Sequence, residues 1–479
     1  MKSAFLAHIA LPILALASAA GAAAEAPAPE APMSYADARA RFHAASDQFR
    51  ADDAAVAREE ARAESARSLS GPKVSFSAMR LEGSKSLDLN LSVPNPVAGV
   101  PGLPSSIRLG YDDKIDLSGY RTILSFVWPI YTGGAISAEQ EALSHHAAQT
   151  RWERDARRDA EDGDLALRYW GVQLARSVEA LRAQAALDEE AELRRAQAME
   201  KKGVISRMER LSVEVSRDRA KREALRAQTD RRVAETEFLR RLRMTALPAL
   251  MNPLFIVRGD LGSLESWQAK AEADSPALKR LESLELEARA GVKAAKSAYA
   301  PQVFAFGMKN LTKHDLTLPE PDWLAGVGVE ITLWSNRDRA SSVAAARSLE
   351  TQAGASCAEA RTTLRRAVEV AWLRAHEARE RYDEIRSSVT LAEENLKMRE
   401  LAFGRGLSKA LDVSHARTEL VGAQVALQGA AYEFVAAWAT LHAAANAMPE
   451  FESSIGRAER APAAEAASAL PQLQKVKTP

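Results

Sequence analysis

Two long stretches without proline constrain this chain more than any other feature of its sequence. They cover residues 130–247 and 322–448, and both are rich in Ala, Arg, Glu, Leu and Gln, which are strong helix formers. We therefore expect one helix over about residues 137–201 and a second over about residues 339–402. At 1.5 Å per residue each helix would be about 95 Å long, whereas helices of globular domains average about a dozen residues. Their apolar faces are thin and alanine-rich, which predicts close packing against other helices, as in a coiled coil.

The second half of the chain repeats landmarks of the first half at a fixed distance. Gly203 and Gly406, which interrupt the two helical stretches, lie 203 positions apart. The matching segments are SFVWPIYTGGAIS (125–137) with GVEITLWSNRDRA (328–340), and MEKKGVISRMERL (199–211) with FGRGLSKALDVS (403–414). Landmarks that keep one offset indicate an internal duplication of a strand pair followed by a long helical hairpin. A third match, ARSLSGPKV (66–74) with AKSAYAPQV (295–303), has a larger offset, so the first copy carries a longer connection between its strands.

The amino terminus has the form of a secretory signal peptide, which we expect over residues 1–24. Lys2 precedes an apolar run, and a small-residue cleavage site, Ala22-Ala23-Ala24, follows. A membrane anchor is the alternative. Cys357 is the only cysteine, so no acylated cysteine at the cleavage site is expected. The rest divides into a first structural repeat (25–247), a connecting segment (248–274), a second repeat (275–448) and a tail (449–479) that we expect to be disordered.

Charge and motifs exclude several classes of function. The 64 basic and 64 acidic residues cancel, so no net field attracts phosphate and no nucleic acid partner is expected. Charges are interspersed along helical segments such as 153–164, where they predict solvated faces with local ion pairs. The sequence shows no phosphate-binding loop, nucleophile elbow or clustered metal-ligand spacing, so we expect no enzymatic activity, cofactor or metal site. No run of about 18 apolar residues follows the signal, so no transmembrane helix is expected.

Four segments break the helical pattern and alternate apolar with polar or small residues. Residues 326–333 are the clearest, with Val327 and Val329 alternating with Gly326 and Gly328. Such a period of two predicts a strand with one face toward lipid or a core. The four predicted strands are 73–78, 120–128, 303–308 and 326–333. Aromatic residues at their ends resemble the aromatic belts of membrane barrels, although a small soluble sheet with an aromatic core is the alternative.

If these strands span a membrane, one chain cannot close the sheet. Outer-membrane barrels need at least about eight strands, and an open edge in lipid leaves unpaired N–H and C=O groups at several kcal/mol each. Several chains must then share one barrel; these considerations favour three or more but do not fix the number. The Pro- and Gly-rich segment 93–104 predicts an exposed loop between the first two strands.

Two longer segments carry a resemblance to a known family. The segments DSPALKRLESLELEARAGVKAAKSAYAPQVFAFG (274–307) and SFVWPIYTGG (125–134) are similar to the helix-to-strand and strand-to-helix stretches of the TolC-like outer-membrane efflux channels. The second copy departs from the family pattern, with Thr332 in place of the proline and Asn336-Arg337 in place of the glycines.

The resemblance implies an α+β membrane protein that is internally duplicated. It implies a homotrimer whose twelve-stranded barrel, with four strands per chain, lies in the lipid of a Gram-negative outer membrane and continues into a periplasmic α-helical barrel. Such channels are the exit ducts of tripartite efflux pumps or type I secretion systems. Their partners are a periplasmic adaptor and an inner-membrane transporter of the RND or ABC type, and they bind no cofactor. The exported substrate does not follow from the sequence.

The resemblance also suggests where a gate lies. In the family, an aromatic-x-x-Gly motif at the periplasmic turn precedes acidic residues that line the closed pore, and here Phe403, Gly406 and Asp412 match. His415 stands at a second acidic position, and Ser408 replaces a basic residue that ties the closed gate. These two departures leave open how the gate is locked.

In the first copy, Gly203 and Glu209 match the corresponding positions of the turn. Asp412 and His415 are three residues apart, on one helical face, and several copies around an axis would make a ring of carboxylates that attracts cations. The equally weighted alternative is that Asp412 and Glu209 stabilise the first turn of a helix, where negative charge suits the helix dipole.

Two other classes of protein compete with the channel. A periplasmic coiled-coil adaptor would normally show one helical hairpin flanked by β domains, whereas two hairpins, each preceded by strands, are expected here. A soluble periplasmic enzyme is disfavoured because the sequence shows no catalytic constellation.

Overall fold

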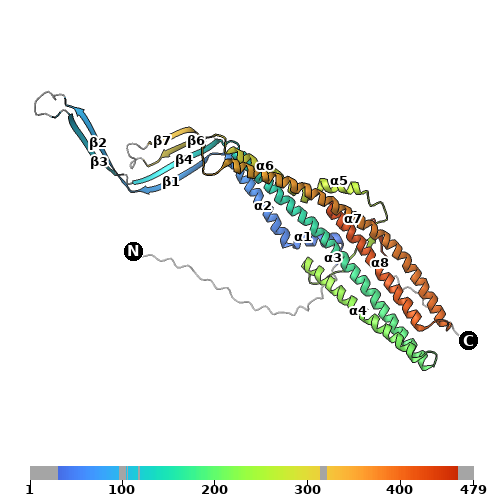
Figure 1. Ribbon diagram of the computed structural model, residues 1–479. Coiled ribbons are helices and arrows are strands. Elements are labelled where there is room, and N and C mark those ends of the chain that lie inside the picture. Colours follow the sequence, from blue (N-terminus) through green and yellow to red (C-terminus); the bar gives the residue numbers. More distant parts are fainter. Residues whose placement is uncertain (1–30, 96–103, 105, 117–118, 313–320, 462–479) are drawn as a thin grey trace, which may run out of the picture.

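The computed structural model describes residues 31–95, 104, 106–116, 119–312 and 321–461. The expected signal peptide therefore lies outside the described residues, as does most of the loop expected at 93–104. The chain is elongated, with a β-sheet toward one end and long helices running away from it (Figure 1). No helix in the described ranges is both long and apolar enough to cross a bilayer.

The sheet contains the four strands that the sequence predicts. They are β1 (Lys73–Leu81), β4 (Gly119–Tyr131), β6 (Gln302–Asn310) and β7 (Trp323–Glu330), all antiparallel, in the order β1-β4-β6-β7. The last strand was expected to continue to residue 333 but ends at Glu330. Its last partner on β6 is Gln302, and the preceding Pro301 has no N–H to extend the ladder.

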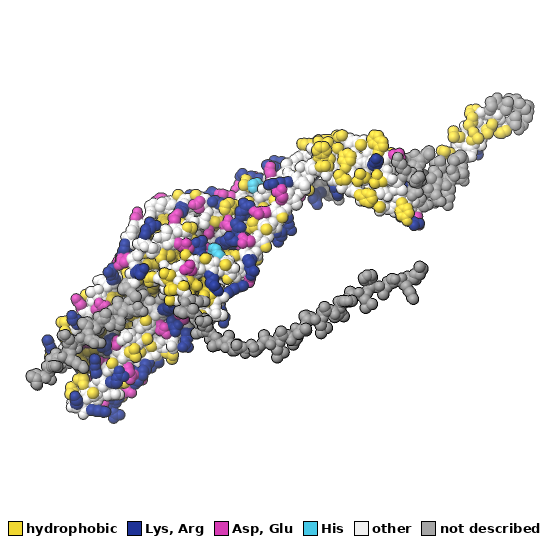
Figure 2. All heavy atoms as spheres, turned by 180° about the vertical axis from the view of Figure 1, so that it is seen from behind, with side chains coloured by type: hydrophobic (Ala, Val, Ile, Leu, Met, Phe, Trp, Pro, Cys, Tyr) yellow, Lys and Arg dark blue, Asp and Glu magenta, His cyan; other side chains and the backbone are white. Residues whose placement is uncertain are grey.

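Both faces of the sheet carry exposed apolar side chains. On one face the exposed large apolar side chains come from β1, β4 and β7. They are Val74, Phe76, Leu124, Phe126, Trp128, Val327 and Val329. On the other face, Met79 and Val127 are also exposed. Ser75 pairs there with Ser125 through their hydroxyls at 2.9 Å. Phe304 lies over Gly328 on this second face, where a Cβ would approach the ring to 2.7 Å. Figure 2 shows hydrophobic side chains gathered on the sheet and mixed charges over the helices.

A second hairpin stands where the sequence predicted only a loop. Strands β2 (Ser84–Pro94) and β3 (Ser106–Asp116) pair antiparallel over their whole length. A signal was present, because Leu89, Leu91 and Val93 alternate with polar residues. The prolines and glycines that follow indicate a loop and conceal the strand signal of this alternation. Two further two-residue strands, β5 (Phe255–Ile256) and β8 (Glu459–Arg460), pair with each other.

The long helices confirm the expectation from proline spacing. Helix α3 (Ala135–Lys201) has 67 residues and α7 (Arg339–Gly404) has 66, so each is about 100 Å long. Each turns back into a second helix, α4 (Arg207–Leu242) after α3 and α8 (Ala410–Ala444) after α7. The two hairpins pack side by side, chiefly through α3 and α8.

Shorter helices pack along the half of the hairpins nearer the sheet. They are α1 (Tyr35–Ala45), α2 (Asp47–Arg67), the 3₁₀ turn η1 (Ser68–Ser70), α5 (Leu264–Asp274), α6 (Pro276–Ser297) and α9 (Met448–Ile455). The start of helix α6 is determined by its local sequence. The hydroxyl of Ser275 accepts a hydrogen bond from the N–H of Leu278, and Pro276 occupies the first turn, where no N–H is needed. Helices α2 and α6 both lie against α3.

The main hydrophobic core lies partway along the long helices. Trp170 of α3 is fully buried, and its ring contacts Tyr35, Tyr169, Phe255 and Phe451. These residues come from α1, α3, β5 and α9, so the core joins both ends of the described chain to the middle of α3.

The expectation of a disordered tail over 449–479 is wrong for its first part. Residues Met448–Ile455 form α9, and Phe451 is fully buried against Tyr35 and Trp170. Burial of one aromatic side chain and the β5–β8 pairing hold this segment in place. Residues 462–479 lie outside the described part.

Candidate functional site: the turns of the helical hairpins

Both hairpins reverse direction at a glycine in the left-handed conformation. Gly203 has φ of 72° and Gly406 has φ of 73°. In the first turn the N–H of Val204 donates to the carbonyl of Met199 at 2.9 Å, and in the second the N–H of Leu407 donates to the carbonyl of Ala402 at 2.9 Å. These bonds satisfy helix-terminal carbonyls, and glycine is favoured because it adopts positive φ without steric cost.

Glu209 and Asp412 each cap the helix that follows their turn. The carboxylate of Glu209 accepts the N–H of Ser206 at 2.9 Å, and the hydroxyl of Ser206 accepts the N–H of Glu209 at 3.2 Å. The carboxylate of Asp412 accepts the N–H of Lys409 and the hydroxyl of Ser408, both at 3.0 Å. These two bonds lower the pKa of Asp412. The carboxylate is therefore held in its charged form at neutral pH.

The structure thus shows the capping role that the sequence left as one of two alternatives. Ser408, which replaces the basic residue of the family pattern, is one of the groups that bind Asp412. The pore-lining role depends on neighbouring copies and stays a prediction.

Phe403 and His415 lie on different surfaces near the turns. Phe403 is half-buried and packs against a small core that joins the two hairpins, formed by Leu193, Ala196, Val213 and Ala410. His415 is exposed and lines a groove of about 370 Å³ between α3, α4 and α8. The structure therefore groups Gly406, Ser408 and Asp412 at the turn and places His415 on the groove.

Sequence reasoning missed a buried ionic contact between the hairpins. Glu189 of α3 is only 3% exposed and accepts the hydroxyl of Ser414 of α8 at 2.7 Å. Arg417 of α8 lies 3.7 Å from Glu189 and donates to Glu400 of α7 at 3.0 Å. Burial raises the pKa of Glu189, while Ser414 and Arg417 act in the opposite direction. Glu189 stands in an acidic run, so no local pattern indicates that this carboxylate is buried.

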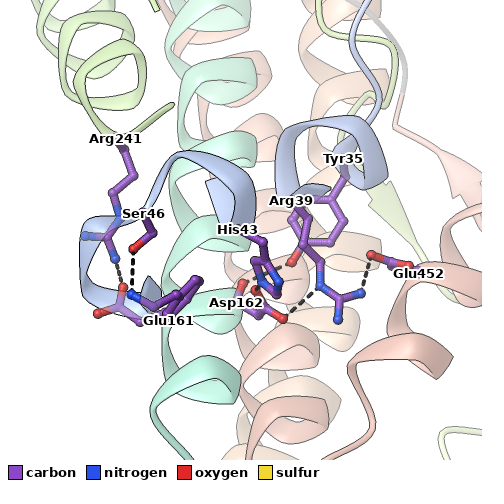
Figure 3. A network of polar contacts seen from close by, with 9 residues as sticks. Tyr35, Arg39, His43, Ser46, Glu161, Asp162, Arg241 and Glu452 are labelled. Atoms are coloured by element: carbon purple, nitrogen blue, oxygen red, sulfur yellow. Dashed lines mark hydrogen bonds and ion pairs between the residues drawn. The ribbon is translucent and has the colours of Figure 1, made fainter. Parts of the chain in front are cut away.

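A second buried network ties the terminal helices to α3 (Figure 3). The carboxylate of Asp162 is 3% exposed and lies 2.8 Å from Arg39 Nε and 2.6 Å from His43 Nε2, both on α1. Arg39 also binds Glu452 of α9 at 2.9 Å. The hydroxyl of Tyr35 donates to the backbone carbonyl of Asp162 at 3.0 Å.

The expectation that residues 153–164 form a solvated face is therefore wrong for part of that segment. The nearby Asp159 is half-buried, and its pKa is raised to about 7, first by burial and then by the charges of Asp162 and Asp155. The periodic charge pattern cannot reveal that α1 covers this part of α3.

Nothing in the described part of the chain forms a group of three or more His, Cys, Asp or Glu side chains able to hold a metal ion.

Comparison with known proteins gives a family match over part of the chain and a shared fold over most of it. Residues 267–447 match the model of a family described as outer membrane efflux protein. No curated protein matches the sequence at a significant level.

Solved structures share the fold over most of the chain. A membrane protein from Pseudomonas aeruginosa aligns with a TM-score of 0.71 and 14% identity over 86% of this chain and 90% of its own. The outer membrane protein VceC from Vibrio cholerae aligns with 0.69 and 13% over 86% of this chain and 96% of its own. The open MtrE outer membrane channel from Neisseria gonorrhoeae aligns with 0.67 and 15% over 86% of this chain and 88% of its own. Residues 267–447 are thus similar to outer membrane efflux proteins, and the chain shares its fold with solved outer membrane channels over most of its length.

Proposed function

We propose that three copies of this chain form a continuous duct, with a twelve-stranded barrel in the outer membrane and a helical barrel in the periplasm of a Gram-negative bacterium. The observation that carries the proposal is the four-stranded sheet, in which β1 and β7 each have one neighbour within the described chain. Its exposed apolar face suits lipid, but its two open edges do not, because unpaired backbone groups are costly in a bilayer. Joining β1 of one copy to β7 of the next removes every open edge.

The helical hairpins supply the periplasmic part of the duct. Their charged surfaces suit water, and helices of about 100 Å reach far from the membrane. We propose that the duct serves a tripartite efflux pump or a type I secretion system, with a periplasmic adaptor and an inner-membrane transporter of the RND or ABC type as partners. The alternative that the chain is itself an adaptor has no support, since its matched domain belongs to the efflux protein family.

Internal duplication accounts for the parallel construction of the two hairpins. Helices α4 and α8 begin at Arg207 and Ala410, and α3 and α7 end at Lys201 and Gly404. Both pairs of boundaries differ by the same 203 positions as Gly203 and Gly406. A duplicated ancestor would give each copy two membrane strands and one hairpin, and so six such units around the duct.

Membrane fractionation tests the proposed duct. We expect the mature protein to stay with the outer membrane, to need detergent for extraction and to migrate as a trimer by light scattering. The purified trimer should conduct ions in a planar bilayer. A water-soluble monomer would contradict the proposal, because one chain has too few strands to seal a barrel.

Charge at the turns gives a sharper test of the gate. We expect Asp412→Ala to lower the preference of the reconstituted channel for cations over anions, because three carboxylates around the axis would be lost. Glu265→Ala is a matched control, since Glu265 is also an acidic residue in the first turn of a helix but lies on α5. The measurement is the reversal potential in a salt gradient. An unchanged reversal potential for Asp412→Ala would leave this residue with its capping role alone.

A further inference from the structure

The connection from β7 to α7 differs in charge from the matching connection of the first repeat. It covers residues 331–338 and lies where the sheet meets the helices (Figure 1). At the offset of 203 positions, Arg337 stands where the first repeat has Gly134. Arg339 likewise stands where it has Ile136. The second repeat therefore brings two guanidinium groups to a junction that is uncharged at these positions in the first repeat.

A pocket of about 350 Å³ lies at this junction, which is within the range of about 300–1,000 Å³ for sites that hold small ligands. The polar residues that line it are Gln302, Glu330, Thr332, Ser335, Arg337, Arg339 and Ser342. Alanines of α6 and of the connection from α6 to β6 form the rest of the lining. Among these described residues, two arginines face one carboxylate, Glu330, so the lining carries a net positive charge.

The two arginines differ in how they are held. The guanidinium of Arg339 donates to the backbone carbonyl of Thr332 and lies 5.6 Å from the centre of the Tyr299 ring. Arg337 is exposed, and its side chain forms no ion pair within the described ranges. The carboxylate of Asp338 does not neutralise either arginine, because it caps the first turn of α7. Arg339 is thus fixed at the pocket, and Arg337 is available to a ligand.

The two most exposed large apolar side chains in the described part of the chain adjoin this pocket. Leu333 is 88% exposed and Trp334 is 85% exposed. They lie between Thr332 and Ser335, which both line the pocket. Exposed apolar area is unfavourable in water, whereas tryptophan is enriched at the boundary between lipid and water.

The corresponding pair in the first repeat indicates what surrounds this level of the sheet. At the same offset, the pair is Ile130 and Tyr131, which are 53% and 51% exposed. They end β4, which lies between β1 and β6 in the sheet and has η1 packed beside it. The end of β4 is therefore not an edge that a neighbouring copy could extend. Its exposed apolar side chains favour lipid as the surroundings at this level.

We propose that the pocket at the β7–α7 junction binds the phosphate of an anionic phospholipid, whose apolar part lies against Leu333 and Trp334. This inference rests on the proposed function, because the proposed barrel places this end of the sheet in the periplasmic leaflet of the outer membrane. Guanidinium groups bind phosphate through paired N–H donors, and basic pockets beside apolar surface suit anionic lipid headgroups. Each chain carries one such pocket, since the first repeat lacks both arginines at the matching positions.

Charge favours a lipid over a second copy of the chain as the occupant. Joining β7 to β1 of the next copy brings the beginning of β1 beside this junction. Residues 71–74 offer one charged side chain there, Lys73, and no carboxylate. A lysine adds to the positive charge of Arg337 and Arg339, whereas a phosphate compensates it.

Lipid binding by the purified trimer tests the pocket. We expect native mass spectrometry of delipidated wild-type trimer to show phosphatidylglycerol bound at about one molecule per chain, several-fold above phosphatidylcholine at equal concentration. Arg337→Gln should lower the occupancy by phosphatidylglycerol several-fold without affecting the fold, because this side chain is exposed. Arg347→Gln is the matched control, since Arg347 is also exposed on α7 but lies about 12 Å further along the helix than Arg339. This variant should bind phosphatidylglycerol as wild type does.

Inorganic phosphate distinguishes a lipid from a free anion. An excess of inorganic phosphate should leave phosphatidylglycerol bound, because only the lipid also covers Leu333 and Trp334. Displacement of the lipid by inorganic phosphate would assign the pocket to a free anion and overturn the lipid site.

Fluorescence quenching tests what covers the apolar pair. In a Cys357→Ala background, a fluorophore on Leu333→Cys should be quenched by brominated phosphatidylcholine vesicles several-fold more than one on Leu349→Cys. Leu349 is also exposed, at 51%, but lies within α7 further from the sheet. Equal quenching at the two positions would show that water or a second copy surrounds Leu333, and would overturn the lipid contact.

The outcomes separate this inference from the proposed function. Wild-type protein that is trimeric and conducting, but binds phosphatidylglycerol no better than phosphatidylcholine, would overturn the lipid site and leave the duct intact. Equal binding by Arg337→Gln and Arg347→Gln trimers would do the same. Wild-type protein without a trimer would instead remove the duct itself.

Discussion

Replacing Asp162 with alanine is expected to lower the free energy of unfolding of the helical region by about 3 kcal/mol. The Asp162 carboxylate is buried between Arg39 and His43, and it joins α3 to α1. Its loss leaves Arg39 with Glu452 as its remaining ionic partner and leaves His43 beside an unfilled space. The measurement is urea unfolding of the detergent-solubilised protein, followed by the circular dichroism of its helices.

Asp164→Ala is the matched control for this substitution. Asp164 lies two residues further along α3, and its side chain is 40% exposed and pairs with Arg168. Exposed pairs contribute at most about 1 kcal/mol, so this variant should unfold near the wild-type urea concentration. Equal midpoints for the two variants would show that the network around Asp162 does not stabilise the fold.

Gly133→Ala is expected to be still more damaging, at about 3 kcal/mol or more, and to reduce the amount of assembled protein in the membrane. Gly133 lies between β4 and α3 and has φ of 64°, where an L side chain is strained. A Cβ at this position would lie 2.4 Å from the Cβ of Ala300 and 3.0 Å from the carbonyl oxygen of Ser297. Ser297 ends α6 and Ala300 lies in the connection from α6 to β6, so the substitution would push the two strand–helix junctions apart.

Substitution of the adjacent glycine, Gly134, is a control that distinguishes the effect of a steric clash from that of backbone strain. Gly134 has φ of 86°, but the nearest atom to a Cβ there is Ser137 Oγ at 3.7 Å. Gly134→Ala should therefore cost only about 1 kcal/mol, from the left-handed conformation alone. The comparison uses urea midpoints and the yield of trimer from outer membranes. Similar losses for the two variants would mean that close packing at the junction is unimportant.

The elements that the sequence predicts well are those with strong periodic signals. The spacing of the prolines predicts the bounds of both long helices to within a few residues. A proline inside a helix removes a hydrogen bond and clashes with the preceding turn. The alternation of apolar with polar or small residues predicts the four strands of the sheet. The glycine turns at 203 and 406 were also predicted, since positive φ there favours glycine.

The missed features depend on contacts between distant segments. Glu189 and Asp162 stand among exposed charges on the same helix, and only the positions of α8 and α1 decide which carboxylates are buried. Helix α9 was missed because its single buried aromatic, Phe451, lies in a short segment next to an Ala- and Pro-rich tail. The roles of Asp412 and His415 in a pore depend on other copies of the chain, which no local pattern describes.

The meeting of the two terminal helices has a consequence for how the protein matures. Tyr35 of α1 packs against Phe451 of α9, and Arg39 binds Glu452. Helix α1 is synthesised early, but its packing partner follows more than 400 residues later. The central core can therefore be completed only after nearly the whole polypeptide is available to fold. A prematurely terminated chain would leave Trp170 without the Phe451 ring and so expose apolar surface that chaperones and proteases recognise.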